Sequence, residues 1–335
     1  MKKKLGIFLF IISSIFSLSS CQDKKDKIII EREENITDFI KLSSTDYGTM
    51  IRNKRSFILT YGSQCVCYTN FKDVLRNIMK NNDLRMYEMN INDLDKVVSY
   101  KEVKTYDPGL LLVQNGIIQY SFDVNKKWEK EIYASDMNKA AQSVKKNLEK
   151  YCYFNSPFYE VNKEKALEKI NSKETVYIYY MRNTCSDCKL FHRYFLNDWI
   201  LKGQYDPTKK IYNFDIDPYR EVDEAYNETE SYIEFKNTFQ LSVAGNPHFG
   251  YKTGVVPTVQ KYENGQLTKM AVIYNDDINM ENMTVVSGYY KDAPFLNKGF
   301  EDELDYRQST TPFYQEKFLE VIDEKKGLLK NLDKN

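Results

Sequence analysis

The sequence predicts an α/β protein made of two tandem domains, each with a central mixed β-sheet flanked by helices. A β-branched and aromatic run leads into a close cysteine pair twice, and an amphipathic helical pattern follows each pair. In both copies a proline also stands seven residues before an Asn-Gly pair, which is typical of a β-hairpin turn. The length of 335 residues suits two domains of ordinary size.

The first copy starts with a predicted buried strand at residues 56–61. A short polar turn leads to Cys65 and Cys67, and the following helix has one apolar face. The remaining elements are a second strand at 87–92, Pro108 ahead of a third strand at 110–113, the Asn115-Gly116 turn, and a returning strand at 117–122. We assign residues 45–150 to this domain.

The second copy repeats this order, with a strand at 175–180 ahead of Cys185 and Cys188. The elements that follow are a strand at 212–217, Pro257 ahead of a strand at 258–262, the Asn264-Gly265 turn, and a strand at 267–274. From second cysteine to proline is 69 residues here and 41 in the first copy, which indicates an insertion near 218–254. We assign the second domain to 156–300 and a C-terminal helical tail to 301–335. Further helices are expected at 134–150, 156–170 and 312–332.

The N-terminus has the pattern of a secreted bacterial lipoprotein. Lysines at 2–4 precede an apolar run of 14 residues, too short to span a bilayer but suited to a signal peptide. The sequence LSSC, ending at Cys21, resembles the lipobox in which the cysteine is acylated; the alternative is an ordinary cleaved signal. We expect a signal peptide at 1–20, a lipid on Cys21, a charged tether at 21–44, and a place on the extracytoplasmic face of a bacterial cell membrane.

The charge balance excludes a typical nucleic-acid-binding protein. Without residues 1–20, 45 basic residues face 48 acidic ones, and no strongly basic segment stands out. Aromatic residues make up 14% of the chain, enough to build two cores.

The order of strand, cysteine pair, helix, second strand and proline-headed hairpin resembles the thioredoxin-like superfamily. The sequence CSDC at 185–188 stands at the family's CxxC, and Val256-Pro257-Thr258 is similar to its cis-proline loop. Tyr179 stands where the family has a buried acid, and Thr184 where it usually has tryptophan. The resemblance implies a thiol-disulfide oxidoreductase that acts on protein thiols and disulfides, uses no cofactor or metal, and exchanges electrons with a membrane partner.

The position of CSDC at a helix start suits disulfide exchange, because the thiolate is the attacking species. Free N–H groups and the helix dipole stabilise a thiolate there. We therefore expect Cys185 to be an exposed nucleophile and Cys188, one turn inward, to resolve the mixed disulfide. Charged neighbours are expected to act in both directions: Asp187 against the thiolate and, in its favour, Arg182, Lys189 and His192.

Other interpretations of the cysteines stay open. Cys65 and Cys67, with Pro108, form either a second redox pair or a structural disulfide of the kind found outside the cytosol. A zinc site built from both pairs is a further alternative, although 118 residues separate them. Cys152 is expected to be a small buried residue. A different class of function is a non-catalytic lipoprotein that uses thioredoxin folds to hold a peptide or protein partner.

Overall fold

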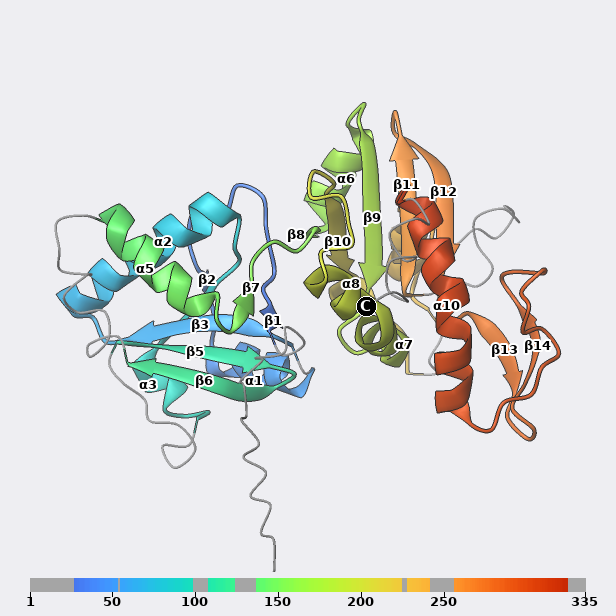
Figure 1. Cartoon of the computed structure of the whole chain (residues 1–335), viewed down its shortest axis with the longest axis horizontal. Coiled ribbons are helices and arrows are strands. Elements are labelled where there is room, and N and C mark those ends of the chain that lie inside the picture. The colour runs from blue at the N-terminus through green and yellow to red at the C-terminus, as the bar shows by residue number, and fades with distance from the viewer. Residues whose placement is uncertain are drawn as a thin grey trace, which may run out of the picture.

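The computed structural model describes residues 27–53, 55–98, 108–123, 137–224, 228–241 and 256–324. The described residues form two five-stranded sheets, one from each half of the chain, drawn on either side of Figure 1. The predicted signal peptide at 1–20, Cys21, and the end of the predicted tail lie outside these residues. In the described parts of the chain, no helix is long and apolar enough to cross a bilayer.

The first sheet has the strand order β2-β4-β3-β5-β6. β3 runs parallel to β4 and antiparallel to β5, so the sheet is mixed as predicted. Its strands are β2 (Ile40–Lys41), β3 (Phe57–Gly62), β4 (Tyr87–Asn90), β5 (Gly109–Gln114) and β6 (Ile117–Asp123). Its helices are α1 (Ser44–Arg52), α2 (Val66–Asn82), α3 (Ile91–Leu94) and α5 (Met137–Leu148).

Successive side chains along the central strands point to opposite faces of the sheet, and this divides the core of the first half into two layers. Ile58 and Leu112 pack with residues of α2 and α5, whereas Phe57 and Leu59 pack with residues of α1. Figure 1 shows α2 and α5 over one face of this sheet and α1 and α3 on the other. The sheet is therefore covered by helices on both sides, which is why its strands read as continuous apolar runs.

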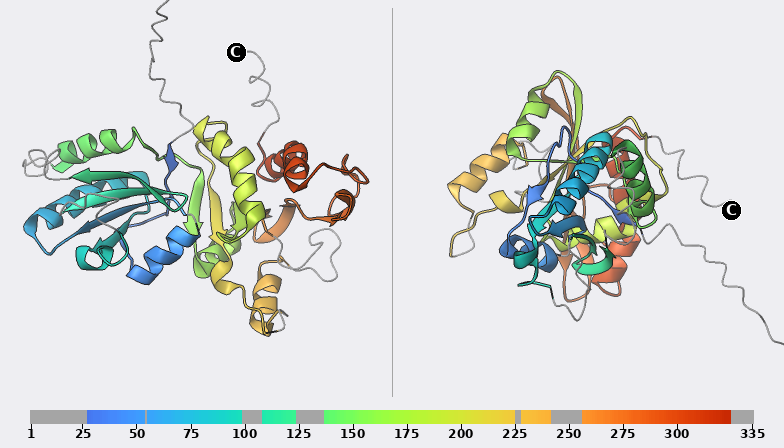
Figure 2. Two further views of the ribbon diagram at one scale, coloured as in Figure 1. Left: turned by 90° about the horizontal axis from the view of Figure 1, so that it is seen from below. Right: turned by 90° about the vertical axis from the view of Figure 1, so that its left-hand side faces the viewer.

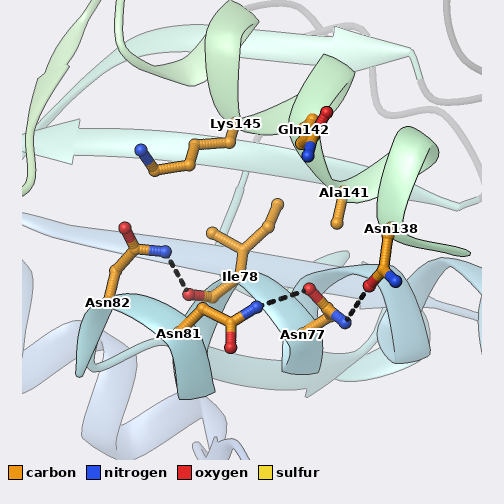
Figure 3. A pocket seen from close by; sticks show the side chains of 8 residues that line it. All are labelled: Asn77, Ile78, Asn81, Asn82, Asn138, Ala141, Gln142 and Lys145. Carbon is orange, nitrogen blue, oxygen red and sulfur yellow. Dashed lines mark hydrogen bonds between the residues drawn. The ribbon is translucent and has the colours of Figure 1, made fainter.

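A polar groove of about 350 Å³ separates the exposed sides of α2 and α5 (Figure 3). Asn77 of α2 donates a hydrogen bond across it to Asn138 of α5 at 3.2 Å, and Asn81 donates to Asn77 along α2 at 2.9 Å. The bond between Asn77 and Asn138 joins the two helices at the surface.

The second sheet repeats the order of the first, β8-β10-β9-β11-β12. Its strands are β8 (Phe158–Val161), β9 (Thr175–Met181), β10 (Ile211–Asp215), β11 (Thr258–Glu263) and β12 (Gln266–Val272). Its helical segments are α6 (Lys163–Asn171), α7 (Ser186–Phe191), the π-helix η2 (His192–Leu196), α8 (Asn197–Leu201), the 3₁₀-helix η3 (Asp217–Tyr219) and α9 (Glu230–Thr238). Both hairpins turn at the predicted Asn-Gly pairs, whose four residues all have positive φ.

The chain ends with a small hairpin and a long helix. The hairpin consists of β13 (Asp276–Asn279) and β14 (Thr284–Gly288), and α10 (Glu303–Val321) packs on β11 and β12. The predicted helix start at residue 312 is wrong, because Pro312 lies inside α10. Asp302 caps the helix instead and accepts a hydrogen bond from Asp305 N, so the helix begins nine residues before the proline.

The segment before α1 differs from the expected charged tether at 21–44, because from Lys27 onward it is part of the fold. β1 (Ile28–Ile29) pairs with β7 (Cys152–Tyr153), and the side chains of Ile28 and Ile30 are 1% and 0% exposed. Arg32 then pairs with both Leu84 and Tyr159, so the segment contacts both domains. The apolar Ile triplet explains its burial, which the surrounding charges masked in the sequence. Cys152 is buried as predicted.

Charged residues of this segment meet partners from both domains. Glu31 pairs with Arg55 and accepts a hydrogen bond from Tyr87 at 2.8 Å. Arg85 lies 3.8 Å from Glu31 and 3.7 Å from Glu160 of β8. Burial opposes the ionisation of Glu31, but the charges of Arg55 and Arg85 hold the pKa of Glu31 below its ordinary value. We call Glu31, Arg55, Arg85, Tyr87 and Glu160 the interdomain cluster.

Candidate active site

The turn after β9 places the CSDC cysteines at a helix start, as predicted. Cys185 is the N-cap of α7, and its Sγ accepts a hydrogen bond from the backbone N–H of Cys188 at 3.3 Å. Both cysteines are present as free thiols. The N-cap position leaves the backbone N–H of Cys188 pointing at Cys185 Sγ, which is an arrangement that favours a thiolate.

Two carboxylates at the end of β10 hold this turn, and sequence reasoning did not identify them. Asp217 accepts hydrogen bonds from Thr184 N at 2.9 Å and from Thr184 Oγ1 at 2.6 Å. Asp215 accepts a hydrogen bond from the side chain of Asn183. The signal for this role was the position of both acids after a strand adjacent to β9, at the edge where parallel strands end.

The cis-proline loop lies against the cysteine pair, as the thioredoxin resemblance implies. The Val256–Pro257 peptide bond is cis, and Cys185 Sγ donates to the carbonyl oxygen of Val256 at 3.5 Å. The expected exposure of Cys185 is wrong in this structure. Cys185 is only 8% exposed and Cys188 only 1%.

The two thiols are electrostatically distinct. The hydrogen bond with the Cys188 side chain lowers the pKa of Cys185 despite burial, and the backbone N–H of Cys188 adds to this effect. Burial raises the pKa of Cys188 well above its ordinary value. The pair therefore contains one thiol suited to attack and one that stays protonated until it is needed.

The charged neighbours act only partly as expected. Asp187 raises the pKa of Cys185 and Arg182 lowers it, as predicted. Arg307 of α10 moderates Asp187 by an ion pair of 2.8 Å, a contact that no local pattern could indicate. The expectation that His192 favours the thiolate is wrong, since burial lowers the pKa of His192 to about 4 and leaves the ring neutral.

Two buried polar atoms lie behind the cysteine pair. The Tyr179 hydroxyl and His192 Nε2 have no hydrogen-bond partner among the described residues, and their rings lie 5.7 Å apart. Tyr179 is fully buried, and burial raises its pKa well above the ordinary value, so its phenol stays neutral. The helix changes to a π-helix at His192, so the predicted continuous helix is interrupted one turn after Cys188.

In the first domain, Cys65 and Cys67 form a disulfide. Cys65 caps α2, and its Sγ accepts a hydrogen bond from Tyr68 N at 3.1 Å. Pro108 lies at the same end of the first sheet as this disulfide, because the adjacent Gly109 pairs with Tyr61 near the end of β3. Among the described residues, no group of three or more potential metal ligands comes together, so the two cysteine pairs do not form a shared site there.

Comparisons with known proteins find likeness only among solved structures. No protein-family model matches the chain, and no curated protein matches it. Thioredoxin from Trypanosoma brucei brucei is 14% identical over 36% of this chain and 81% of its own, with a TM-score of 0.23. ERdj5 is 9% identical over 72% of this chain and 28% of its own, with a TM-score of 0.27. The zinc-bound form of human ERp44 is 12% identical over 60% of each chain, with a TM-score of 0.25.

These likenesses are partial and low in identity, so the fold assignment depends on the structure itself. Both sheets have the same strand order, and in each a cysteine pair follows the second strand and caps the next helix. In each, a proline also heads the antiparallel hairpin. Each half of the chain therefore has the strand order and the cysteine position of the thioredoxin fold.

Proposed function

We propose that the chain is a membrane-anchored, extracytoplasmic thiol-disulfide oxidoreductase that acts on protein disulfides through Cys185 and Cys188. The observation that carries this proposal is the position of Cys185 Sγ, between the N-terminus of α7 and the carbonyl of the cis Val256–Pro257 peptide. Anchoring through an acylated Cys21 and a bacterial source come from the N-terminal sequence pattern, and a membrane redox partner comes from the resemblance to the thioredoxin-like superfamily.

The geometry suits a two-step exchange. The Cys185 thiolate attacks one sulfur of a substrate disulfide, which releases the other substrate sulfur as a thiolate and forms a mixed disulfide. Cys188 then loses its proton and attacks Cys185 Sγ, which releases the second substrate thiolate and forms the Cys185–Cys188 disulfide. Two electrons pass from the cysteine pair to the substrate, and the same steps in reverse oxidise a substrate dithiol.

The shape of the site adds a requirement for substrate entry. Because Cys185 is 8% exposed and bonded to the Val256 carbonyl, the contact between sulfur and loop has to open before a substrate disulfide can approach. An extended substrate segment then takes over the hydrogen bonding of the loop backbone. This closed arrangement is also the observation that favours the alternative, a non-catalytic lipoprotein that binds a peptide or protein partner.

Trapping with single-cysteine variants separates the two functions. In Cys188→Ser, the first step proceeds but resolution fails, so mixed disulfides with a disulfide-containing protein such as insulin should accumulate at Cys185. Cys185→Ser should trap nothing. Adding Cys152→Ser to Cys188→Ser is the matched control, since Cys152 is a buried free thiol and its loss should leave trapping unchanged. Equal trapping by Cys185→Ser, or none by Cys188→Ser, would contradict the oxidoreductase and leave the binding function.

A further inference from the structure

We propose that the end of α5 and the adjacent start of β1 form a docking surface for an anionic lipid bilayer. This inference rests on the proposed anchoring at Cys21 for the chain's place at a membrane, and it adds which face of the fold lies against the lipid. The surface, which we call the basic surface, consists of four lysines and one tyrosine: Lys27, Lys145, Lys146, Lys150 and Tyr120.

The members of the basic surface come from segments that are far apart in the sequence but adjacent in the fold. β1 pairs with β7, the strand that follows α5, so the start of β1 meets the end of α5 in both Figure 1 and Figure 2. The Lys27 side chain donates to the carbonyl oxygen of Glu149 at 2.8 Å, and Ile28 N donates to the carbonyl oxygen of Tyr151 at 2.8 Å. The sequence does not reveal this group, because Lys27 lies 122 positions before Glu149.

The basic surface carries an excess of positive charge. Lys146 and Lys150 are exposed, and Lys150 donates to the neutral side chain of Asn147 at 3.0 Å, a contact that leaves its charge uncompensated. Lys145 pairs with Glu149 at 2.7 Å. The four lysines of the surface and this carboxylate together carry a net charge of +3. Lysines at a helix C-terminus also complement the helix dipole, so the charge alone does not identify a partner.

Tyr120 adds an aromatic side chain of the kind found where proteins meet lipid headgroups. It lies on β6, an edge strand of the first sheet, and is 40% exposed. Its ring centroid lies 3.9 Å from that of Tyr151, the residue that follows Lys150, so Tyr120 reaches the chain next to the lysines. Tyrosine is enriched at membrane–water interfaces because its ring is apolar and its hydroxyl polar. Lysines beside an exposed tyrosine therefore suit anionic headgroups.

The short chain between Cys21 and the fold favours a lipid surface over a soluble acidic protein. Lys27 lies six positions after Cys21, so a lipid on Cys21 holds Lys27 within about 20 Å of the bilayer. Residues 22–26 contain two basic and two acidic side chains, so this connection adds no net charge of its own. The anchor makes docking an intramolecular event, for which weak attraction suffices. Each lysine beside an anionic surface then favours the docked arrangement about fivefold.

The test attaches the chain from Gln22 onward to vesicles through an N-terminal histidine tag and nickel-chelating lipid. It therefore needs neither acylation of Cys21 nor activity of the second cysteine pair, and their failure would not affect the result. Every described contact lies at or after Lys27, so this chain keeps the described fold. The vesicles are phosphatidylcholine alone or an equimolar mixture with phosphatidylglycerol. The readout is the acetylation rate of each lysine at physiological ionic strength, followed by peptide mass spectrometry.

Lys146 and Lys150 should be acetylated several-fold more slowly on the anionic vesicles than on the neutral ones. Lys173 and Lys298, exposed lysines of the second half of the chain, are internal references and should keep the same rate on both. Molar salt should remove the protection, because it screens the surface charge. The same slowing at all four lysines would overturn the proposal, and so would equal rates at Lys146 on both vesicles, which would favour an acidic protein as the partner.

A charge variant ties the protection to the lysines themselves. Lys150→Gln removes one positive charge from an exposed side chain, so the urea midpoint should stay unchanged. The variant should lose most of the protection of Lys146 on anionic vesicles, since each lysine contributes about fivefold. Lys298→Gln removes the same charge in the second half of the chain and is the matched control, which should leave the protection of Lys146 unchanged. Full protection of Lys146 in Lys150→Gln would show that the lysines do not direct docking, and the proposal would fail.

Discussion

Glu160→Gln tests whether the interdomain cluster makes the stability of the chain depend on pH. Burial, followed by the nearby charge of Glu31, raises the pKa of Glu160 to about 7 from an ordinary 4.5. Asn213 Nδ2 donates to Glu160 Oε1 at 2.5 Å, and Arg85 lies 3.7 Å away, but these contacts do not offset the burial. Glu160 is therefore protonated in the folded chain at pH 5 and must ionise as the pH rises past 7.

The direction and size of the pH effect on stability follow from the pKa values of Glu160 in the folded and the unfolded chain. Between pH 4.5 and 7 the folded state binds a proton at Glu160 that the unfolded state has released, so folding stability falls as the pH rises. Each pKa unit corresponds to about 1.4 kcal/mol, which gives an upper limit of about 3.5 kcal/mol for this shift. Glutamine keeps an oxygen acceptor for Asn213 but does not ionise. The variant should therefore match the wild type at pH 5 and exceed its stability by up to about 3.5 kcal/mol at pH 8.

The assay is urea unfolding of both proteins at several pH values between 5 and 8, followed by far-UV circular dichroism. The difference in free energy of unfolding between variant and wild type should grow with pH. Glu164→Gln, an exposed acid in the first turn of α6, is the control for a change of surface charge. A constant difference across this range, or a wild type that gains stability relative to the variant, would refute the account of the cluster.

Three further predictions concern the site and the anchor. Asp217→Ala removes the acceptor of two Thr184 hydrogen bonds and should lower the free energy of unfolding in urea by about 1–2 kcal/mol. Asp217→Asn keeps an acceptor and should lower it by less than half as much. Equal losses in the two variants would argue against this contact. Tyr179→Phe removes a buried hydroxyl that has no hydrogen-bond partner in the described residues, so it should leave the free energy of unfolding unchanged or raise it by about 1 kcal/mol. A decrease of more than about 1 kcal/mol would show that the hydroxyl has a hydrogen-bond partner. Cys21→Ala should abolish labelling of the protein with a radioactive fatty acid in cells, and undiminished labelling would exclude acylation at Cys21.

Much of the fold was predictable because its signals are local. The strands around both cysteine pairs and the Asn-Gly turns each depend on a few adjacent residues, whereas the cis-proline loop was implied by the resemblance to the thioredoxin-like superfamily. The repeat then supplied the long-range information, since a pattern that occurs twice in one order implies the same topology twice. The Pro312 error has the opposite cause: a proline often starts a helix, but the Asp302 cap ten residues earlier determined the actual start.

The parts that were missed depend on contacts between distant segments. Arg307 reaches Asp187 from a helix more than 100 residues away, and no periodicity links them. The charges of residues 31–34 favoured a solvated tether, whereas Glu31 finds Arg55 and Arg85 at the interface between the domains. The burial of Cys185 has the same origin, since it depends on how closely the Val256–Pro257 loop approaches the start of α7.

The central claim is that Cys185 is the nucleophile of a functional pair, and the pH dependence of its alkylation tests this most directly. The reduced protein is treated with limiting iodoacetamide at pH values from 5 to 10, and the modified cysteine is identified by peptide mass spectrometry. The account predicts that, of Cys152, Cys185 and Cys188, Cys185 is modified first, with an apparent pKa below the ordinary thiol value of 9.0. Cys188 and Cys152, whose pKa values burial raises, react only after unfolding. Faster modification of Cys188, or a Cys185 pKa at or above 9.0, would contradict it.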